Sequence, residues 1–445
     1  MSLFGIVLGL VLLMFLAYKG FSIIWVAPVC AVVVAVLSGY NVLDAYIGDY
    51  MKGMADYVFQ WFPPFFLGAV YGKVMDMTGS ARSLGNSLVK LIGSKFAVLA
   101  VVLPCLLMTY GGISLFVVVF VIYPMGYSIY RAADLPRTLL PGAIATGAFG
   151  ITMTAIPGSP QIQNLIPTSY YGTTTMAAPL LSIVACVVMF VPAYIYLEWR
   201  ASQARKKGLH FVADPKHKEI EYDESAMPSW HWLSGLVPLI VVVLMLNLFP
   251  VLLENATGIT LASNYAIVIA LVCGILVCCL MNLNQAKILM PAINEGANGS
   301  MGAIMNTACA VGFGSVVKVV PGFAVLTNIA LNMPGSILFS EAVAVNLLAG
   351  ATGSASGGMS IALEALGPQY AEMAAGNTST LESLHRIASI SSGGLDTLPH
   401  NGAVLTLLAV SNCTHKESYL DICVTTCIIP LVASLVLALI WGMFI

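Results

Sequence analysis

Charged side chains are scarce in this chain. Of its 445 residues, 20 are Asp or Glu and 18 are Lys or Arg, so only 9% carry a charge, whereas 59% are hydrophobic. Soluble globular domains are about a quarter charged. This shortage excludes a soluble enzyme, a nucleic-acid-binding protein and a disordered regulator. The chain instead contains repeated long apolar runs, which are typical of a polytopic α-helical membrane protein.

Metal-binding and nucleotide-binding motifs are also missing. The ten cysteines lie almost all inside apolar runs, no CxxC pair occurs, and no histidine stands at metal-ligand spacing. Cysteines in such runs behave as small hydrophobic residues. No glycine-rich loop carries the lysine that a nucleotide-driven pump requires. We therefore predict no metal and no cofactor.

The apolar runs predict ten membrane spans, five on each side of a charged linker at 200–229, which holds eleven of the charged residues. The spans are expected at 3–18, 21–39, 57–79, 138–166 and 177–197, and then at 235–253, 264–281, 299–320, 384–412 and 421–444. Two further apolar segments, 96–130 and 338–366, are too long for one crossing and are interrupted by small polar residues. We interpret each of them as a re-entrant hairpin.

The basic residues predict how the chain is oriented, because cytoplasmic loops of membrane proteins are enriched in Lys and Arg. With the linker inside, fifteen of the 18 basic residues face the cytoplasm, and only Lys52, Lys318 and Arg386 lie outside. This predicts a multi-pass protein of the inner (cytoplasmic) membrane with both termini outside. His385 and Arg386 are expected at the outer surface. Glu341 on the second hairpin is expected either to reach the binding site or to face water at its mouth.

The two halves of the chain align at a constant offset of 242, which superposes spans, hairpins and helix breakers such as Pro157 and Pro399. Five spans are an odd number, so the second copy must be inverted in the membrane. We expect an all-α protein of two inverted repeats, 1–199 and 230–445, each with five transmembrane helices, one re-entrant hairpin and a broken helix. Secondary transporters have this architecture, with their sites at the midplane.

The polar breaks in the hairpins and in spans 138–166 and 384–412 predict one shared site. Non-helical backbone at membrane depth is tolerated where it is buried in protein or lines a cavity. A broken helix also presents unpaired N–H groups to an anion. The residues expected to bind a small hydroxylated organic anion are Thr109, Gly111, Gly112, Ser114, Thr152, Thr154, Gly158, Ser159, Gln161, Thr352, Gly353, Ser354, Ser356, Ser391, Ser392, Thr397 and Asn401. The alternative is that these small residues only allow helices to pack closely.

Asp396 and His400 are the only acid and imidazole expected deep within a span, four residues apart around Pro399. Burying an ionisable group in a membrane costs at least about 2.5 kcal/mol, so such groups usually mark an ion or proton path. Histidine titrates near physiological pH. We predict that the pair couples transport to protons. The alternative is that Asp396 caps the restarted helix and His400 packs as a neutral donor.

The chain resembles the gluconate:proton symporter (GntP-type) permease family of the ion transporter superfamily, nearly end to end. The resemblance is carried by residues 5–10, 15–20, 392–402 and 414–417. It implies a homodimeric, proton-coupled importer of an organic anion that moves its substrate by an elevator motion. Sugar-acid members carry His-Pro-Gly in the first broken span, where this chain has Ile156-Pro157-Gly158. The chain therefore looks nearer to the branch for short hydroxy acids such as 3-hydroxybutyrate than to gluconate carriers.

Three other functions are weighed against proton symport. Sodium coupling is the nearest, because unwound backbone carbonyls can hold Na⁺. A passive anion channel and a membrane-embedded enzyme are the others, although no nucleophile stands beside a base at known spacing. The expected partners are a small organic anion, protons, the lipid bilayer and a second copy of the chain.

Overall fold

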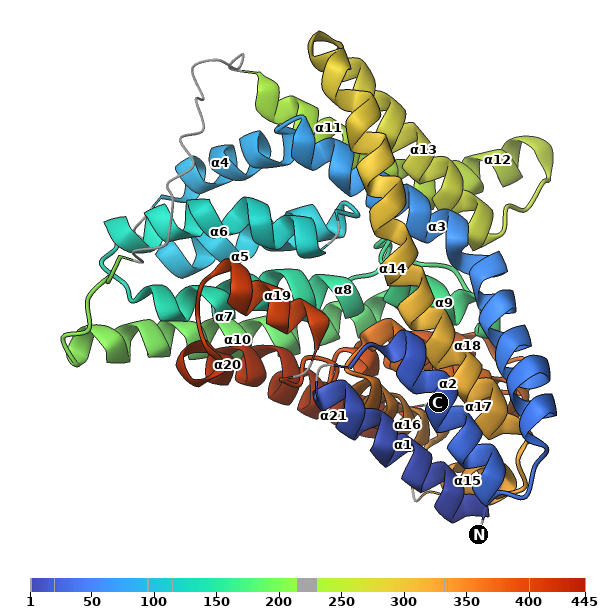
Figure 1. Cartoon of the computed structure of the whole chain (residues 1–445). Coiled ribbons are helices and arrows are strands. Elements are labelled where there is room, and N and C mark those ends of the chain that lie inside the picture. The colour runs from blue at the N-terminus through green and yellow to red at the C-terminus, as the bar shows by residue number, and fades with distance from the viewer. Residues whose placement is uncertain are drawn as a thin grey trace.

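The computed structural model describes residues 2–444 apart from Gly20, Ser94, Lys95, Ser114, 214–229, Asn332, Pro334 and His400. All regular elements in that part are helices (Figure 1). Those of the first half are α1 (Ser2–Tyr18), α2 (Ile23–Leu37), α3 (Met51–Met77), α4 (Ser80–Ile92), α5 (Ala97–Tyr110), α6 (Leu115–Ala132), α7 (Leu140–Ala145), α8 (Thr152–Thr154), α9 (Ile162–Tyr171) and α10 (Pro179–Lys206). Those of the second half are α11 (His231–Asn247), α12 (Phe249–Thr257), α13 (Ser263–Met281), α14 (Ala286–Val319), α15 (Gly322–Leu331), α16 (Ile337–Thr352), α17 (Ala355–Met373), α18 (Thr378–Ser392), α19 (Gly402–Val410), α20 (His415–Cys423) and α21 (Ile429–Trp441).

Two helix groups can be followed in Figure 1. The 34-residue helix α14 runs obliquely across the molecule and packs along α3, and it also contacts α2 and α17. In the other group, α5, α6 and α7 lie against one another, and α20 packs on α7. Small residues allow the close approach of α3 and α14, because a Cβ on Gly53 would lie only 2.0 Å from Ser315 Oγ.

The two segments interpreted as hairpins each consist of two packed helices joined by a short turn: α5 with α6, and α16 with α17. Each turn has a glycine with a left-handed backbone, Gly112 with φ of 91° and Gly353 with φ of 60°. Glycine adopts this conformation without the steric cost that a side chain adds. The turns therefore lie where the sequence predicted them, and whether the pairs re-enter the membrane stays a prediction.

Six of the predicted spans fall on single unbroken helices, namely α1, α2, α3, α10, α13 and α14. In the described part of the chain, three helices are long and apolar enough to cross a membrane, namely Pro179–Lys206, Leu283–Val319 and His415–Trp441. The helices α11 and α12 form a further candidate, bent by 42° at their junction. Of the other predicted spans, three lie on the shorter apolar helices α1, α2 and α13, and 57–79 lies on the unbroken helix α3. The spans 138–166 and 384–412 are interrupted by non-helical residues.

One boundary differs from the predicted one, and one helix was not predicted. The helix α10 continues to Lys206, so Arg200 belongs to a helix and not to the start of the linker, most of which lies outside the described residues. The helix α4 was not predicted at all. Its apolar residues alternate with polar ones such as Arg82 and Lys90, so it forms an amphipathic helix and not an apolar run.

Candidate functional site

The first broken span loses helical geometry after α8 and regains it at α9. Inside the break, Gly158 has a φ of 74°, and its N–H donates to the carbonyl oxygen of Thr175 at 2.9 Å. Ser159 beside it is fully buried. Before the break, the hydroxyls of Thr152 and Thr154 donate to carbonyl oxygens of the preceding turn. A hydroxyl that donates can still accept, so both keep capacity for a ligand.

The segment leading into this break is a π-helix, η4 (Thr146–Ile151), and it contacts a second π-helix, η7 (Val424–Ile428). A Cβ on Gly150 of η4 would lie 3.7 Å from the Cγ2 of Thr426 in η7. Segments of π-helix are rare and often occur at functional sites. The apolar pattern of the sequence predicted neither of them.

The second broken span has its interruption between α18 and α19. Asn401 caps α19, because its Oδ1 accepts from the N–H groups of Ala403 at 2.7 Å and Val404 at 3.0 Å. Its Nδ2 donates to the carbonyl oxygens of Gly353 and Asp396, both at 2.9 Å. The amide of Asn401 is therefore fully engaged in holding the break. The alternative in which Asp396 caps the restarted helix is wrong.

Asp396 is buried in the second break, with 3% of its surface exposed. Its Oδ1 has no hydrogen-bond partner among the described residues. Its predicted partner His400 lies outside the described residues. The structure thus describes the acid of the predicted coupling pair, and it places that acid where a lone charge is costly.

The first helix-pair turn packs directly on the first break. The side-chain amide of Gln161 donates to the carbonyl oxygen of Thr109 at 2.7 Å. A Cβ on Gly112 would lie 3.0 Å from Cγ of Pro160, whereas Gly111 packs on α11. The hydroxyl of Thr109 is buried and has no hydrogen-bond partner within the described part of the chain. Ser114, which was predicted to bind substrate, lies outside the described residues.

The second turn is held mainly by its own side chains. Ser354 caps α17 by accepting from the N–H of Gly357 at 3.1 Å. Ser356 is half-buried in the first turn of that helix.

Four of the predicted hydroxyls donate within their own segments: Thr152, Thr154, Thr352 and Ser392. In this conformation the hydroxyl protons bond to backbone carbonyl oxygens. The lone pairs of the same hydroxyls remain able to accept a hydrogen bond from a ligand.

The two broken spans meet, as the sequence predicted for one shared site. The hydroxyl of Ser389 on α18 donates to the carbonyl oxygen of Thr154 at 2.7 Å. A Cβ on Gly393 would lie 2.8 Å from Cγ2 of Thr154. On the other side of the second break, the hydroxyl of Thr397 donates to the carbonyl oxygen of Thr426 at 2.9 Å. Ser389 and Thr426 were not predicted, because polar residues at ordinary helical positions give no sequence signal.

Several buried side-chain groups near the second break lack hydrogen-bond partners among the described residues. They are Ser391 Oγ, Asp396 Oδ1 and Asn346 Oδ1. Asn346 lies against the break itself, because a Cβ on Gly394 would come within 1.7 Å of its Oδ1. Buried polar groups are nearly always hydrogen-bonded, so such a cluster calls for an explanation. A bound ligand or a proton would supply the missing partners.

Glu341 was expected to reach the site or to face water, and it does not face water. It is fully buried on α16, where its Oε1 accepts a hydrogen bond from the hydroxyl of Tyr171, and its Oε2 has no partner among the residues that the structure describes. Tyr171 is the last residue of α9, so this contact joins the second helix pair to the first broken span. Glu341 is therefore a second buried carboxyl group close to the broken spans.

The prediction that His385 and Arg386 border the outer surface is wrong. Both are fully buried on α18. One ring nitrogen of His385 lies 2.6 Å from Thr173 Oγ1 and the other lies 3.2 Å from Asn164 Oδ1. The loop between α9 and α10 covers this face of α18 and removes it from water, which residue order alone could not reveal.

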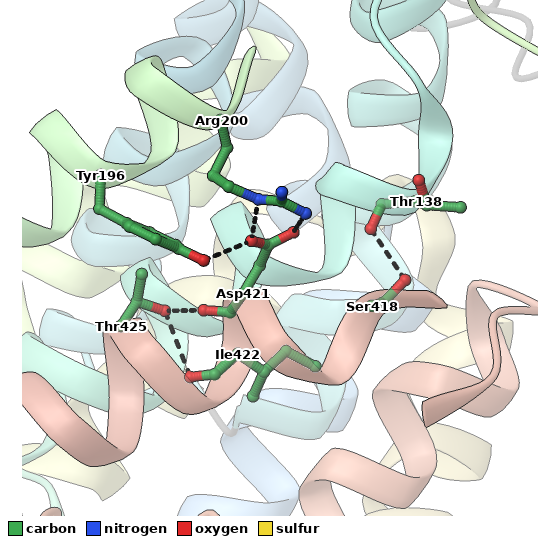
Figure 2. Close-up of polar contacts among 7 residues, drawn as sticks. All are labelled: Thr138, Tyr196, Arg200, Ser418, Asp421, Ile422 and Thr425. Carbon is green, nitrogen blue, oxygen red and sulfur yellow. Dashed lines mark hydrogen bonds and ion pairs between the residues drawn. The ribbon is translucent and has the colours of Figure 1, made fainter. Parts of the chain in front are cut away.

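An ion pair secures the helix that leads into η7. Figure 2 shows the carboxylate of Asp421 facing the guanidinium of Arg200, with Nε–Oδ1 and Nη2–Oδ2 distances of 2.6 and 3.2 Å. The hydroxyl of Tyr196 donates to the same carboxylate at 2.8 Å. About one helical turn earlier in α20, the hydroxyl of Ser418 donates to the carbonyl oxygen of Thr138. These contacts anchor α20 to α10 and to the start of the first broken span.

Comparisons with known proteins agree with this picture. The family model described as GntP family permease matches residues 1–443. The uncharacterized transporter YxjC of Bacillus subtilis (strain 168) is 40% identical over 455 residues, which cover 96% of this chain and 96% of that protein. The solved structure of the Alcanivorax borkumensis YdaH transporter has a TM-score of 0.58 and 16% identity, covering 91% of this chain and 89% of that one. Neisseria gonorrhoeae MtrF, reported as illuminating a class of antimetabolite efflux pumps, has a TM-score of 0.55 and 12% identity, covering 90% and 85%. At such identities the two structures show a shared fold alone.

Proposed function

The chain belongs to the GntP family of permeases, and from this premise we propose that it imports a small hydroxycarboxylate together with protons. Family membership makes it a multi-pass membrane transporter and not an enzyme, and both structural neighbours are transport proteins. The substrate, the coupling ion and the direction of transport are the content of the proposal.

The observation that carries the proposal is the buried carboxyl group of Asp396 in a break that contacts the other break. A buried carboxylate without a partner is strongly disfavoured, so a proton or another cation is needed to neutralise it. Moving one charge across a membrane involves about 2.3 kcal/mol per 100 mV. A proton that travels with a carboxylate anion cancels this electrical cost, which is the physical reason for symport.

The polar groups around the breaks support a hydroxylated acid as substrate. Thr109 and Ser391 have buried hydroxyls without partners, and the hydroxyl of Thr154 can still accept. Such groups suit the hydroxyl of a substrate better than an apolar chain. The absence of the His-Pro-Gly run of sugar-acid carriers favours a short acid of the 3-hydroxybutyrate type over gluconate.

We extend the proposal to the predicted architecture: two inverted repeats, re-entrant helix pairs, a cytoplasmic linker that follows α10, both termini outside and a homodimer. Similar contacts in the two halves, made by residues that each stand two positions from the offset of 242, support the repeats. In each half, an amide side chain of the broken span donates to a carbonyl in the turn of the helix pair. The donors are Gln161 and Asn401, and the acceptors belong to Thr109 and Gly353.

Uptake into proteoliposomes tests the proposed function. Labelled 3-hydroxybutyrate or gluconate should accumulate when an inward proton gradient is imposed, and replacing sodium by choline at constant pH should change nothing. If uptake depends on sodium, the coupling ion is Na⁺ and not the proton. Equilibration without accumulation would indicate a passive channel, and failure of every organic anion to enter would overturn the proposal. His400→Ala should abolish accumulation more than exchange.

A further inference from the structure

Arg386 is a fully buried arginine whose charge has no acidic partner in the described part of the chain. Its Nε lies 3.3 Å from the carbonyl oxygen of Ala177, and its Nη2 lies 3.1 Å from that oxygen and 3.2 Å from the carbonyl oxygen of Thr175. Its Nη1 makes no hydrogen bond there. Ion pairs among the described residues are made by other basic side chains, such as Lys73, Arg200, His210 and Lys318.

In this arrangement the charge of Arg386 is not neutralised, and part of its hydrogen-bonding capacity is unused. A guanidinium has five N–H groups and stays protonated in proteins. The carbonyl oxygens compensate one edge of the Arg386 side chain, and both N–H groups of Nη1 remain without acceptors. A buried charge normally persists only when it is paired. The group that would satisfy Nη1 and neutralise the charge is an anion.

Arg386 also connects the two broken spans. It stands on α18, the helix that ends in the second break. Its acceptor Thr175 also accepts from the N–H of Gly158 at 2.9 Å and from Nδ2 of Asn164 at 3.0 Å. The same amide of Asn164 donates to the carbonyl oxygen of Ser159. The guanidinium is thus anchored to the first break while its helix leads into the second.

We propose that Nη1 of Arg386 binds the carboxylate of the transported anion. This inference rests on the proposed function and adds the receptor for the charged end of the substrate. Arginine suits this task because its N–H groups form charge-assisted hydrogen bonds to carboxylate oxygens. In this proposal one anion neutralises one buried cation, and the coupling proton is held elsewhere.

Binding to the purified protein tests the assignment with two probes, 3-hydroxybutyrate and its neutral amide, 3-hydroxybutyramide. The wild type should prefer the carboxylate. Arg386→Gln should weaken carboxylate binding at least tenfold and leave amide binding unchanged, and Arg386→Lys should retain part of the preference. Arg137→Gln is the matched control, because Arg137 also donates to two carbonyl oxygens, those of Ser411 and Asn412. It should bind both probes like the wild type.

If Arg386 has a purely structural role, Arg386→Gln lowers the affinity for both probes or the thermal midpoint and leaves the ratio of the two affinities unchanged. That result overturns the inference. If Arg386→Gln does not fold, modification of the wild type by phenylglyoxal decides. 3-Hydroxybutyrate should protect Arg386 and the amide should not, and equal modification in both cases overturns the assignment. Carboxylate binding without proton-driven uptake would contradict only the proposed coupling. Proton-driven uptake by Arg386→Gln with an unchanged KM would contradict only the role of Arg386.

Discussion

The side-chain amide of Gln161 donates a 2.7 Å hydrogen bond to the carbonyl oxygen of Thr109 and so ties the first broken span to the turn between α5 and α6. Asn401 makes the corresponding contact with Gly353 in the second half. The breaks are themselves joined through Ser389 and Thr154. Two breaks and two turns therefore form one connected polar unit, and a displacement of either turn should be felt at both breaks.

Replacing Gln161 by Ala should slow transport. The change removes one of the donors to the carbonyl oxygen of Thr109, which keeps the N–H of Gly112, and the loss of one such hydrogen bond costs about 0.5–1.5 kcal/mol. Hydrogen exchange at residues 109–113 should accelerate, and the uptake rate should fall. Gln60→Ala is the control, because its exposed amide also donates one hydrogen bond, to Ser169 Oγ. Equal behaviour of the two variants would show that the turn is held by packing alone.

Asp396→Asn should separate coupling from binding. The asparagine keeps the size of the side chain but cannot carry a proton, so substrate exchange should persist while accumulation against a gradient is lost. Proteoliposomes loaded with unlabelled substrate measure exchange, and an imposed proton gradient measures accumulation. Asp134→Asn should have no effect, because that carboxylate is exposed and bonded to His210. Accumulation by Asp396→Asn would remove Asp396 from the proton path.

Gly394→Ala should impair transport because the added Cβ would lie 1.7 Å from Asn346 Oδ1 and 3.3 Å from Cα of Leu431. Overpacking of this kind typically costs about 1–3 kcal/mol. The thermal midpoint and the uptake rate should both fall. Asn346→Ala in the same chain should restore part of the loss by removing the clashing amide. Gly402→Ala is the control, since nothing lies within 4 Å of its missing Cβ.

Arg200→Met should destabilise the protein more than Asp421→Asn, because the carboxylate that the first change leaves unpaired is 1% exposed, whereas the guanidinium that the second leaves is 28% exposed and can be solvated. Removing one partner leaves the other without its counter-charge, at a cost of roughly 3 kcal/mol for a well-buried pair. A double-mutant cycle on thermal midpoints in detergent should give a coupling energy between about 0.5 and 3 kcal/mol. Additive effects of the two changes would contradict the pairing in Figure 2.

The class of protein and the family could be predicted from the sequence because both depend on composition and on segment order. The resemblance read from residues 392–402 and 414–417 is confirmed by the family match over residues 1–443. The breaks were predictable too, because Pro157 and Pro399 interrupt apolar runs. A contact between the two breaks was expected, whereas Ser389, which makes this contact with Thr154, was not predicted.

Other features depend on tertiary contacts that leave no local pattern. The burial of Arg386 follows from the loop carrying Thr175 and Ala177, which is more than two hundred residues away in sequence. The ion pair of Arg200 with Asp421 joins residues that charge counting had assigned to a linker and to a span end. The π-helices η4 and η7 also went unpredicted, because apolar periodicity does not distinguish π from α geometry.

The unbroken length of α14 has a mechanical consequence. Its 34 residues correspond to roughly 51 Å at 1.5 Å per residue, which exceeds a hydrocarbon core of about 30 Å. Such a helix adapts to the bilayer by tilting or by extending beyond it. Because α14 packs on both α3 and α17, a change in its tilt would be transmitted to the second helix pair. The thickness of the surrounding bilayer would therefore affect the position of the helix pair that carries Gly353.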